Sequence, residues 1–136
     1  MSVLASLRGE TGVDYVDNAI KLAGFTMNTC RKAIPKGYTF YGGTKICETA
    51  IEVASHADRA NGIYPTNKDE ARIRRRELLL ARAALKDLVV WVASMFEAIH
   101  FEMKILEEWS MYIDKEFALL AGILDSDARR AKSLPD

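Results

Sequence analysis

The side chains that could hold a metal ion form one incomplete arrangement. Glu97 and His100 have the Glu-x-x-His spacing that di-iron proteins use in helical bundles. Such a site needs a second Glu-x-x-His motif and two further glutamates on facing helices, and no second motif occurs in the sequence. Glu52 and His56 are four residues apart and flank an apolar seam. A single motif at a predicted helix end favours a solvated histidine, so we predict no metal site.

Nucleophilic catalysis has equally little support. Cys30 lies in an apolar seam, where a thiol is usually inert, and no G-x-S-x-G motif occurs. The segment Gly42-Gly-Thr-Lys45 resembles part of a phosphate loop, but the Walker spacing is absent. These glycines are more typical of a chain that turns into a helix. We therefore predict a protein that is not an enzyme, has no catalytic residue and uses no cofactor.

The two cysteines and the chain's hydropathy bear on its compartment. Cys30 and Cys47 fall on different predicted helices. A disulfide and two free thiols both fit this placement, and a reducing cytosol favours free thiols. The first residues lack the long apolar core of a signal peptide, and no apolar run reaches the roughly 20 residues that cross a bilayer. We expect a cytoplasmic protein without a membrane partner.

Two groups of basic residues remain as candidates for binding. The chain has 19 basic and 19 acidic residues, but residues 1–96 carry four more basic than acidic side chains and residues 97–136 the reverse. The basic residues either pair with acids on their own helices, which stabilises little, or contact a phosphate backbone. Charge alone does not decide between the two interpretations. The candidate contact residues are Arg31, Lys32, Lys36, Arg72, Arg74, Arg75 and Arg76.

The periodicity of the apolar residues predicts the elements that carry these side chains. Apolar positions in steps of three and four predict helices over about 11–34, 41–61, 66–99 and 103–124. Helices of this length joined by short turns predict an all-α fold, an antiparallel up-down-up-down four-helix bundle. We expect one bundle over 11–125, an N-terminal tail over 1–10 and a basic C-terminal tail over 126–136.

Capping residues indicate where most of these helices begin and end. Thr11 is the predicted N-cap of the first helix, and Gly62 is predicted to end the second in a left-handed conformation. Thr66 and Asp69 form a start for the third that is similar to a capping box. No such residue separates the third helix from the fourth. A change of seam alone places that turn near residues 100–102.

Trp91 indicates an apolar surface beyond the core seam. It lies off the main seam of the third predicted helix, at helical spacing from Ala84 and Leu88. A helix with a second apolar stripe usually packs against two neighbours, and one of them can be another subunit. We therefore expect a homo-oligomer.

Several short segments resemble one family of four-helix-bundle proteins. That family includes the large-subunit rRNA intervening-sequence proteins and the accessory variability determinant (Avd) of diversity-generating retroelements. The segments are Ile34-Pro-Lys-Gly-Tyr-Thr-Phe40, a helix ending at Ala60-Asn61, and Arg74-Arg-Arg-Glu-Leu-Leu-Leu-Ala-Arg-Ala-Ala-Leu85. Residues 3–9, 16–19 and 117–122 are more similar to the retroelement group. The resemblance covers roughly residues 3–124.

The resemblance implies a non-enzymatic accessory subunit. Proteins of the retroelement group form homopentameric barrels and associate with the element's reverse transcriptase and its template-repeat RNA. They support mutagenic, adenine-directed copying of the template into a variable target gene. By this analogy the seven candidate basic residues contact RNA phosphates or the polymerase.

The neutral net charge departs from the family, because its well-known members are strongly basic. A neutral chain can depend more on docking to the polymerase than on affinity for RNA. The alternative is an oligomeric four-helix-bundle protein that binds another structured RNA or a protein, in the manner of the rRNA intervening-sequence relatives.

Overall fold

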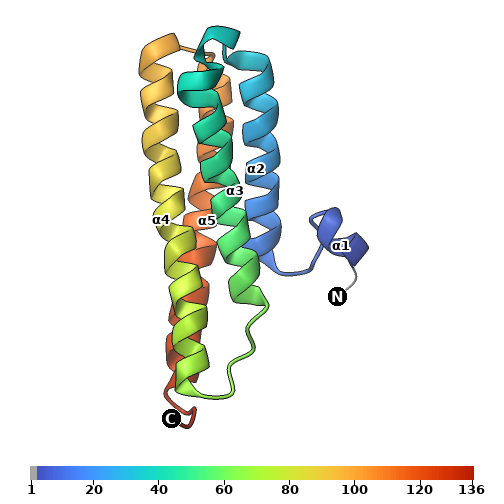
Figure 1. The fold of residues 1–136 in the computed structure, drawn as a ribbon, viewed down its shortest axis with the longest axis vertical. Coiled ribbons are helices and arrows are strands. Elements are labelled where there is room, and N and C mark those ends of the chain that lie inside the picture. The colour runs from blue at the N-terminus through green and yellow to red at the C-terminus, as the bar shows by residue number, and fades with distance from the viewer. Residues whose placement is uncertain (1–2) are drawn as a thin grey trace.

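The computed structural model describes residues 3–136, and the regular structure in this range is helical, as predicted. A short helix, α1 (Val3–Leu7), buries none of its residues and stands apart from the others (Figure 1). Four long helices lie side by side in a helical bundle. They are α2 (Asp14–Ala33), α3 (Thr44–Asn61), α4 (Lys68–Ile99) and α5 (Met103–Ala131).

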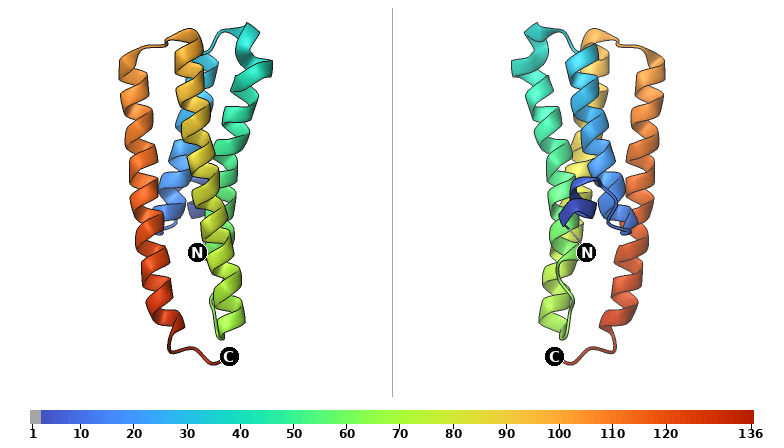
Figure 2. Two further views of the ribbon diagram at one scale, coloured as in Figure 1. Left: turned by 90° about the vertical axis from the view of Figure 1, so that its left-hand side faces the viewer. Right: turned by 90° about the vertical axis from the view of Figure 1, so that its right-hand side faces the viewer.

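The links between the helices define the two ends of the bundle. The α2–α3 and α4–α5 links lie at one end, which we call the Arg31 end (Figure 1). The α3–α4 link and the C-terminal segment lie at the other, which we call the Arg74 end. Both α2 and α4 pack against α3 and α5. Helices α4 and α5 run side by side from the link that joins them to the Arg74 end, as both views in Figure 2 show.

The core is built from the predicted seams, with one correction on α5. Small side chains of α3 let large residues of α4 approach closely. On α5, Ser110 is exposed, whereas Trp109 is fully buried and donates its Nε1–H to Thr26 Oγ1 at 3.0 Å. The steps of three and four through Leu106 and Ile113 predict Ser110 on the core side of this helix, and that prediction is wrong by one residue. The central residues of the core are Val16, Leu22, Ile46, Ala50, Val53, Ala57, Leu78, Leu85, Leu88, Trp109 and Leu120.

One predicted cap and one predicted cap conformation are wrong. Val13 occupies the N-cap position of α2, and Thr11 instead donates its N–H to the Asp17 carboxylate at 2.9 Å. The loop before α2 is therefore fixed by Asp17, a residue in the first turn of that helix. At the end of α3, Gly62 has φ −77°, in the right-handed region, and its N–H donates to Asp58 O. This last turn simply continues the helical hydrogen bonding.

The turn between α4 and α5 is where the change of seam predicts it. Helix α4 ends at Ile99 and α5 begins at Met103. His100 takes the left-handed conformation with φ 45°, a position that glycine usually fills. Its N–H donates to Phe96 O at 2.9 Å and its ring meets the edge of the Phe96 ring. Because a histidine ends the helix, the sequence carries no glycine signal there.

The predicted tails differ from the structure. Residues up to Ala131 continue α5, so only the last five residues lie outside a helix at this end. At the other end, residues 1 and 2 of the predicted N-terminal tail lie outside the described residues, and α1 forms within the rest of it. Within residues 3–136 no helix is long and apolar enough to cross a membrane.

One carboxyl group is buried inside the bundle. Glu116 of α5 is 0% exposed, and its Oε1 accepts a hydrogen bond from Asn18 Nδ2 at 3.0 Å. Its Oε2 has no hydrogen-bond partner among the described residues. Burial raises the pKa of Glu116 to about 7, while the Asn18 hydrogen bond and the charge of Lys115 act in the other direction.

Glu116 should make the stability of the bundle depend on pH. The folded state holds the Glu116 proton between an ordinary pKa of 4.5 and about 7, so stability falls as the pH rises through this window. Glu116→Gln, which mimics the protonated acid, should remove about 2–3 kcal/mol of the difference in unfolding free energy between pH 5 and pH 8. Urea unfolding at both pH values measures it. Glu108→Gln, at an exposed position, is the control and should leave the difference unchanged.

Candidate nucleic-acid interface

The first turn of α4 is held by an N-cap that lies one residue later in the chain than predicted. Asn67 is the N-cap, and its Oδ1 accepts from the Glu70 N–H at 2.8 Å. Glu70 in turn accepts from the Thr66 N–H at 2.8 Å. The pair is therefore Asn67 and Glu70, and the predicted pair of Thr66 and Asp69 is wrong. This cap fixes the direction in which the basic residues of the first turns project.

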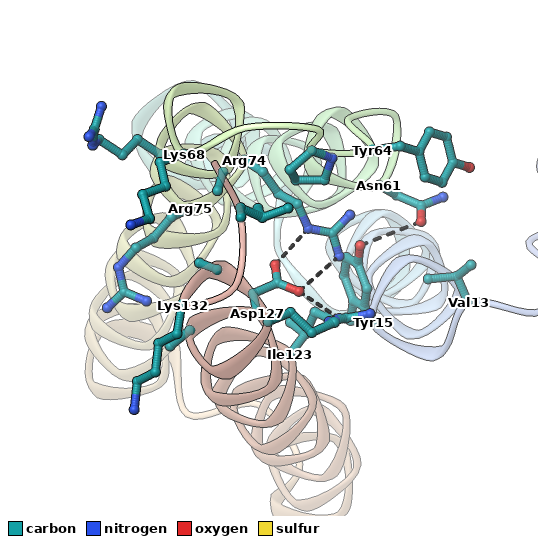
Figure 3. Close-up of a pocket in the computed structure, with 17 residues that line it drawn as sticks. Val13, Tyr15, Asn61, Tyr64, Lys68, Arg74, Arg75, Ile123, Asp127 and Lys132 are labelled. Carbon is teal, nitrogen blue, oxygen red and sulfur yellow. Dashed lines mark hydrogen bonds and ion pairs between the residues drawn. The ribbon is translucent and has the colours of Figure 1, made fainter. Parts of the chain in front are cut away.

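Arg74 is held inside the Arg74 end. It is 9% exposed, and its Nε donates to Asp127 Oδ2 at 2.6 Å (Figure 3). Its Nη1 donates to the carbonyl oxygens of Ala60 and Ile63 at 3.2 and 3.0 Å. The guanidinium thus joins α4, α5 and the end of α3. Its hydrogen-bonding groups face protein atoms. Arg74 is therefore buried, whereas the other six candidate contact residues are exposed.

A cavity of about 810 Å³ surrounds this buried ion pair. Figure 3 shows Lys68, Arg75 and Lys132 on one side of the pair, and Tyr64 and Asn61 on the other. Apolar residues complete the lining, including Val13, Ile123 and Leu134. Burial raises the pKa of the Tyr15 hydroxyl, against the nearby charge of Arg74, so Tyr15 stays neutral.

Five basic residues besides Arg74 line this cavity, and we call them the basic cluster: Lys68, Arg72, Arg75, Arg130 and Lys132. Three are in ion pairs: Arg72 with Asp69, Arg130 with Asp127 and Lys68 with Asp136. Arg75 and Lys132 have no ion pair among residues 3–136. Exposed pairs contribute little to stability, so these side chains can exchange their carboxylates for phosphate oxygens.

The other predicted contact residues lie elsewhere. Arg31, Lys32 and Lys36 are exposed at the Arg31 end, and Arg31 donates to Asn28 Oδ1 at 2.9 Å. Arg76 is exposed on α4 and does not line the cavity. The structure therefore brings Arg72 and Arg75 together with Lys68, Arg130 and Lys132. It does not unite the seven candidates in one site.

The link between α2 and α3 adds aromatic side chains at the Arg31 end. It consists of a 3₁₀ turn, η1 (Lys36–Tyr38), and one turn of π-helix, η2 (Thr39–Gly43). Phe40 and Tyr41 are 91% and 81% exposed. Gly42 lies so close to Met95 that a Cβ atom there would displace the methionine's terminal methyl group. The link is thus seated on α4 while its aromatic side chains face solvent.

The cysteines lie near each other in a second cavity, of about 490 Å³, under this link. Both are free thiols. Burial, and then the neighbouring Cys47, raise the pKa of Cys30 to about 12, so its thiol is protonated and a poor nucleophile at neutral pH.

Neither histidine lies in the Glu–His pair that its sequence spacing suggested as a metal site. His56 Nδ1 lies 2.7 Å from Glu77 Oε2 on α4, not beside a second ligand on its own helix. His100 packs against Phe96. Among the described residues, no three or more His, Cys, Asp or Glu side chains form a group that could hold a metal ion.

Sequence reasoning missed Asp127, Arg130 and Lys132 as parts of this end. A signal for Asp127 was present, since it lies three residues after Leu124 and so continues the α5 seam. Arg74 likewise interrupts the α4 seam. Two opposite charges on the seams of adjacent helices indicate a buried ion pair, provided that the helices are known to meet there. A comparison with models of protein families gives no match to the chain, and neither curated proteins nor solved structures give one.

Proposed function

We propose that this chain is a non-enzymatic accessory subunit of a diversity-generating retroelement. It binds the reverse transcriptase and the template-repeat RNA, and it acts as a cytoplasmic homo-oligomer of antiparallel up-down-up-down four-helix bundles. The pentamer is the assembly that the family resemblance implies. The observation that carries the proposal is the basic cluster, in which five cations from the start of α4 and the end of α5 line one cavity.

The basic cluster suits a phosphate backbone better than a single small anion. Its cations come from the start of α4 and the end of α5, so more than one phosphate can be contacted at once. Lys and Arg side chains arranged in this way bind successive phosphates and release counterions. Arg74 contributes indirectly, because its bond to Asp127 holds α4 and α5 at the spacing that the cluster needs.

The Arg31 end fits the polymerase. Arg31, Lys32 and Lys36 lie in the last turn of α2 and the link after it, as do the exposed Phe40 and Tyr41. Aromatic residues and arginine are the types most enriched at the centres of protein interfaces. In this arrangement one end of the bundle contacts RNA and the other contacts protein, which is compatible with a neutral chain.

A second candidate function is binding of a different structured RNA or a protein partner, in the manner of the rRNA intervening-sequence proteins. The zero net charge favours it, because the family's retroelement members are strongly basic. A neighbouring reverse-transcriptase gene with a template repeat separates the two, since only the first function requires it.

Salt dependence of RNA binding tests the proposed interface. We expect binding of fluorescently labelled template-repeat RNA, measured by anisotropy, to weaken with salt with a log–log slope of about −2 to −4, because three to five phosphates are contacted. A scrambled RNA of equal length is the control and should show a similar slope, because phosphate contacts carry no sequence information. No binding, or a slope near zero, would contradict the interface.

A further inference from the structure

The side of α4 that faces away from the core carries a continuous stripe of exposed residues. They recur in steps of three and four along about five turns, and all of them are exposed. In the left view of Figure 2 no other helix lies in front of α4. Three of these residues are large and apolar: Ile73, Leu80 and Val90 are 56%, 38% and 64% exposed. The outer stripe comprises Ile73, Arg76, Leu80, Ala83, Asp87 and Val90.

The spacing of the outer stripe is that of a coiled-coil seam. Ile73, Leu80 and Asp87 are seven residues apart, as are Arg76, Ala83 and Val90. These two series alternate in the way that the a and d positions of a heptad do. Most seams of this kind are apolar throughout, so the two charged residues need partners of opposite charge on the facing helix.

The outer stripe is complementary to itself when reversed. If a second α4 lies antiparallel, with the crossing between residues 81 and 82, each residue faces a defined partner on the other copy. Ile73 then faces Val90, and Leu80 faces Ala83.

The two charged residues of the stripe match in the same register. Arg76 of each copy faces Asp87 of the other. Neither residue has an ion pair of its own among residues 3–136. A parallel pairing would instead place Arg76 against Arg76 and Asp87 against Asp87. Charge therefore selects both the direction and the register of the helix pair.

We propose that the outer stripe of α4 is a dimer interface that binds a second copy of this chain, antiparallel and about a two-fold axis. Each contact is made twice, as in any isologous interface. A ring joins two different faces of the subunit, so this contact is additional to a ring and can link two of them. It refines the homo-oligomer of the proposed function. Its test uses the protein without RNA or polymerase, so the two proposals succeed or fail separately.

The contact is short, and the association should be reversible. At 1.5 Å per residue, the segment from 73 to 90 is about 26 Å long. An interface of one helix on each side is near the lower limit for specific association, so the dimer should depend on protein concentration.

Charge exchange tests the pairing. Sedimentation velocity over a roughly hundredfold concentration range should show self-association of the wild type. Arg76→Asp and Asp87→Arg should each weaken it about tenfold, since each places two like-charge pairs in the interface. The double variant R76D/D87R restores opposite charges and should return to within about threefold of the wild type. Lys104→Asp changes the charge equally at an exposed site off the stripe and should have no effect.

The rescue by the double variant is the decisive comparison, because a general charge effect would not produce it. Circular dichroism confirms that each variant is folded. A monomeric wild type, single variants that associate normally, or a double variant as weak as the singles would each overturn the proposed interface.

Discussion

Asp127→Ala should cost about 3–5 kcal/mol of unfolding free energy, the largest stability change that we expect from an ion-pair substitution here. The substitution leaves the Arg74 guanidinium buried without its carboxylate, and the side chains of the pair are only 11% and 17% exposed. The remaining bonds to the Ala60 and Ile63 carbonyls do not neutralise the charge. Urea unfolding at neutral pH measures the loss.

A control on the same helix separates burial from ion pairing. Asp125 pairs with Arg129 at 3.3 Å, but both side chains are more than two-thirds exposed. Asp125→Ala should therefore cost less than about 0.5 kcal/mol. The double variant R74M/D127M should recover most of the loss from Asp127→Ala, because apolar side chains often replace a buried pair without cost. Similar losses for Asp127→Ala and Asp125→Ala would show that the Arg74 pair is not buried in solution.

Reversing three charges of the basic cluster should weaken RNA binding roughly a hundredfold at moderate salt. The variant is Arg72→Glu, Arg75→Glu and Lys132→Glu, all at exposed positions. Each change removes a cation and adds an anion beside the RNA backbone. New acids near the start of α4 are also compatible with the helix dipole, so the fold should persist. Anisotropy with labelled template-repeat RNA measures the affinity.

The matched control reverses three charges at the Arg31 end: Arg31→Glu, Lys32→Glu and Lys36→Glu. This variant has the same net charge as the first one. It should keep RNA affinity within about threefold, and it should lose association with the reverse transcriptase. If both variants lose RNA affinity equally, total charge rather than the Arg74 end governs binding. Unchanged affinity in the first variant excludes the basic cluster as the RNA contact.

The helical elements could be predicted because their apolar periodicity is strong. The predicted ranges for α2, α3 and α4 agree with the structure to within a few residues. The ends were less accurate, since Thr11 does not cap α2, and Gly62 ends α3 in a right-handed rather than a left-handed conformation. The turn at His100 was found from the change of seam alone. The prediction for α5 is wrong at Ser110 because Trp109 and Ser110 are adjacent, and the spacing of the apolar residues allows either one to face the core.

The candidate site was predictable only in part. The sequence marks Arg72, Arg74 and Arg75 as cations in one helix start, and the apolar seam places Arg74 on the core side, but it does not give the partner of Arg74. That partner is Asp127, 53 positions away, and it is reached only because α4 and α5 meet there. Lys132 and Arg130 join the cluster because α5 continues past Leu124. The roles of these residues follow from tertiary contacts, which local periodicity does not encode.

The most direct test of the proposed function is affinity purification of the tagged chain from its native host at moderate salt. Mass spectrometry and RNA sequencing identify what is recovered. The proposal predicts a reverse transcriptase together with a discrete template-repeat RNA for the wild type. It also predicts loss of the RNA for the Arg72, Arg75 and Lys132 variant. Recovery of the bundle alone, or with ribosomal material, would contradict it.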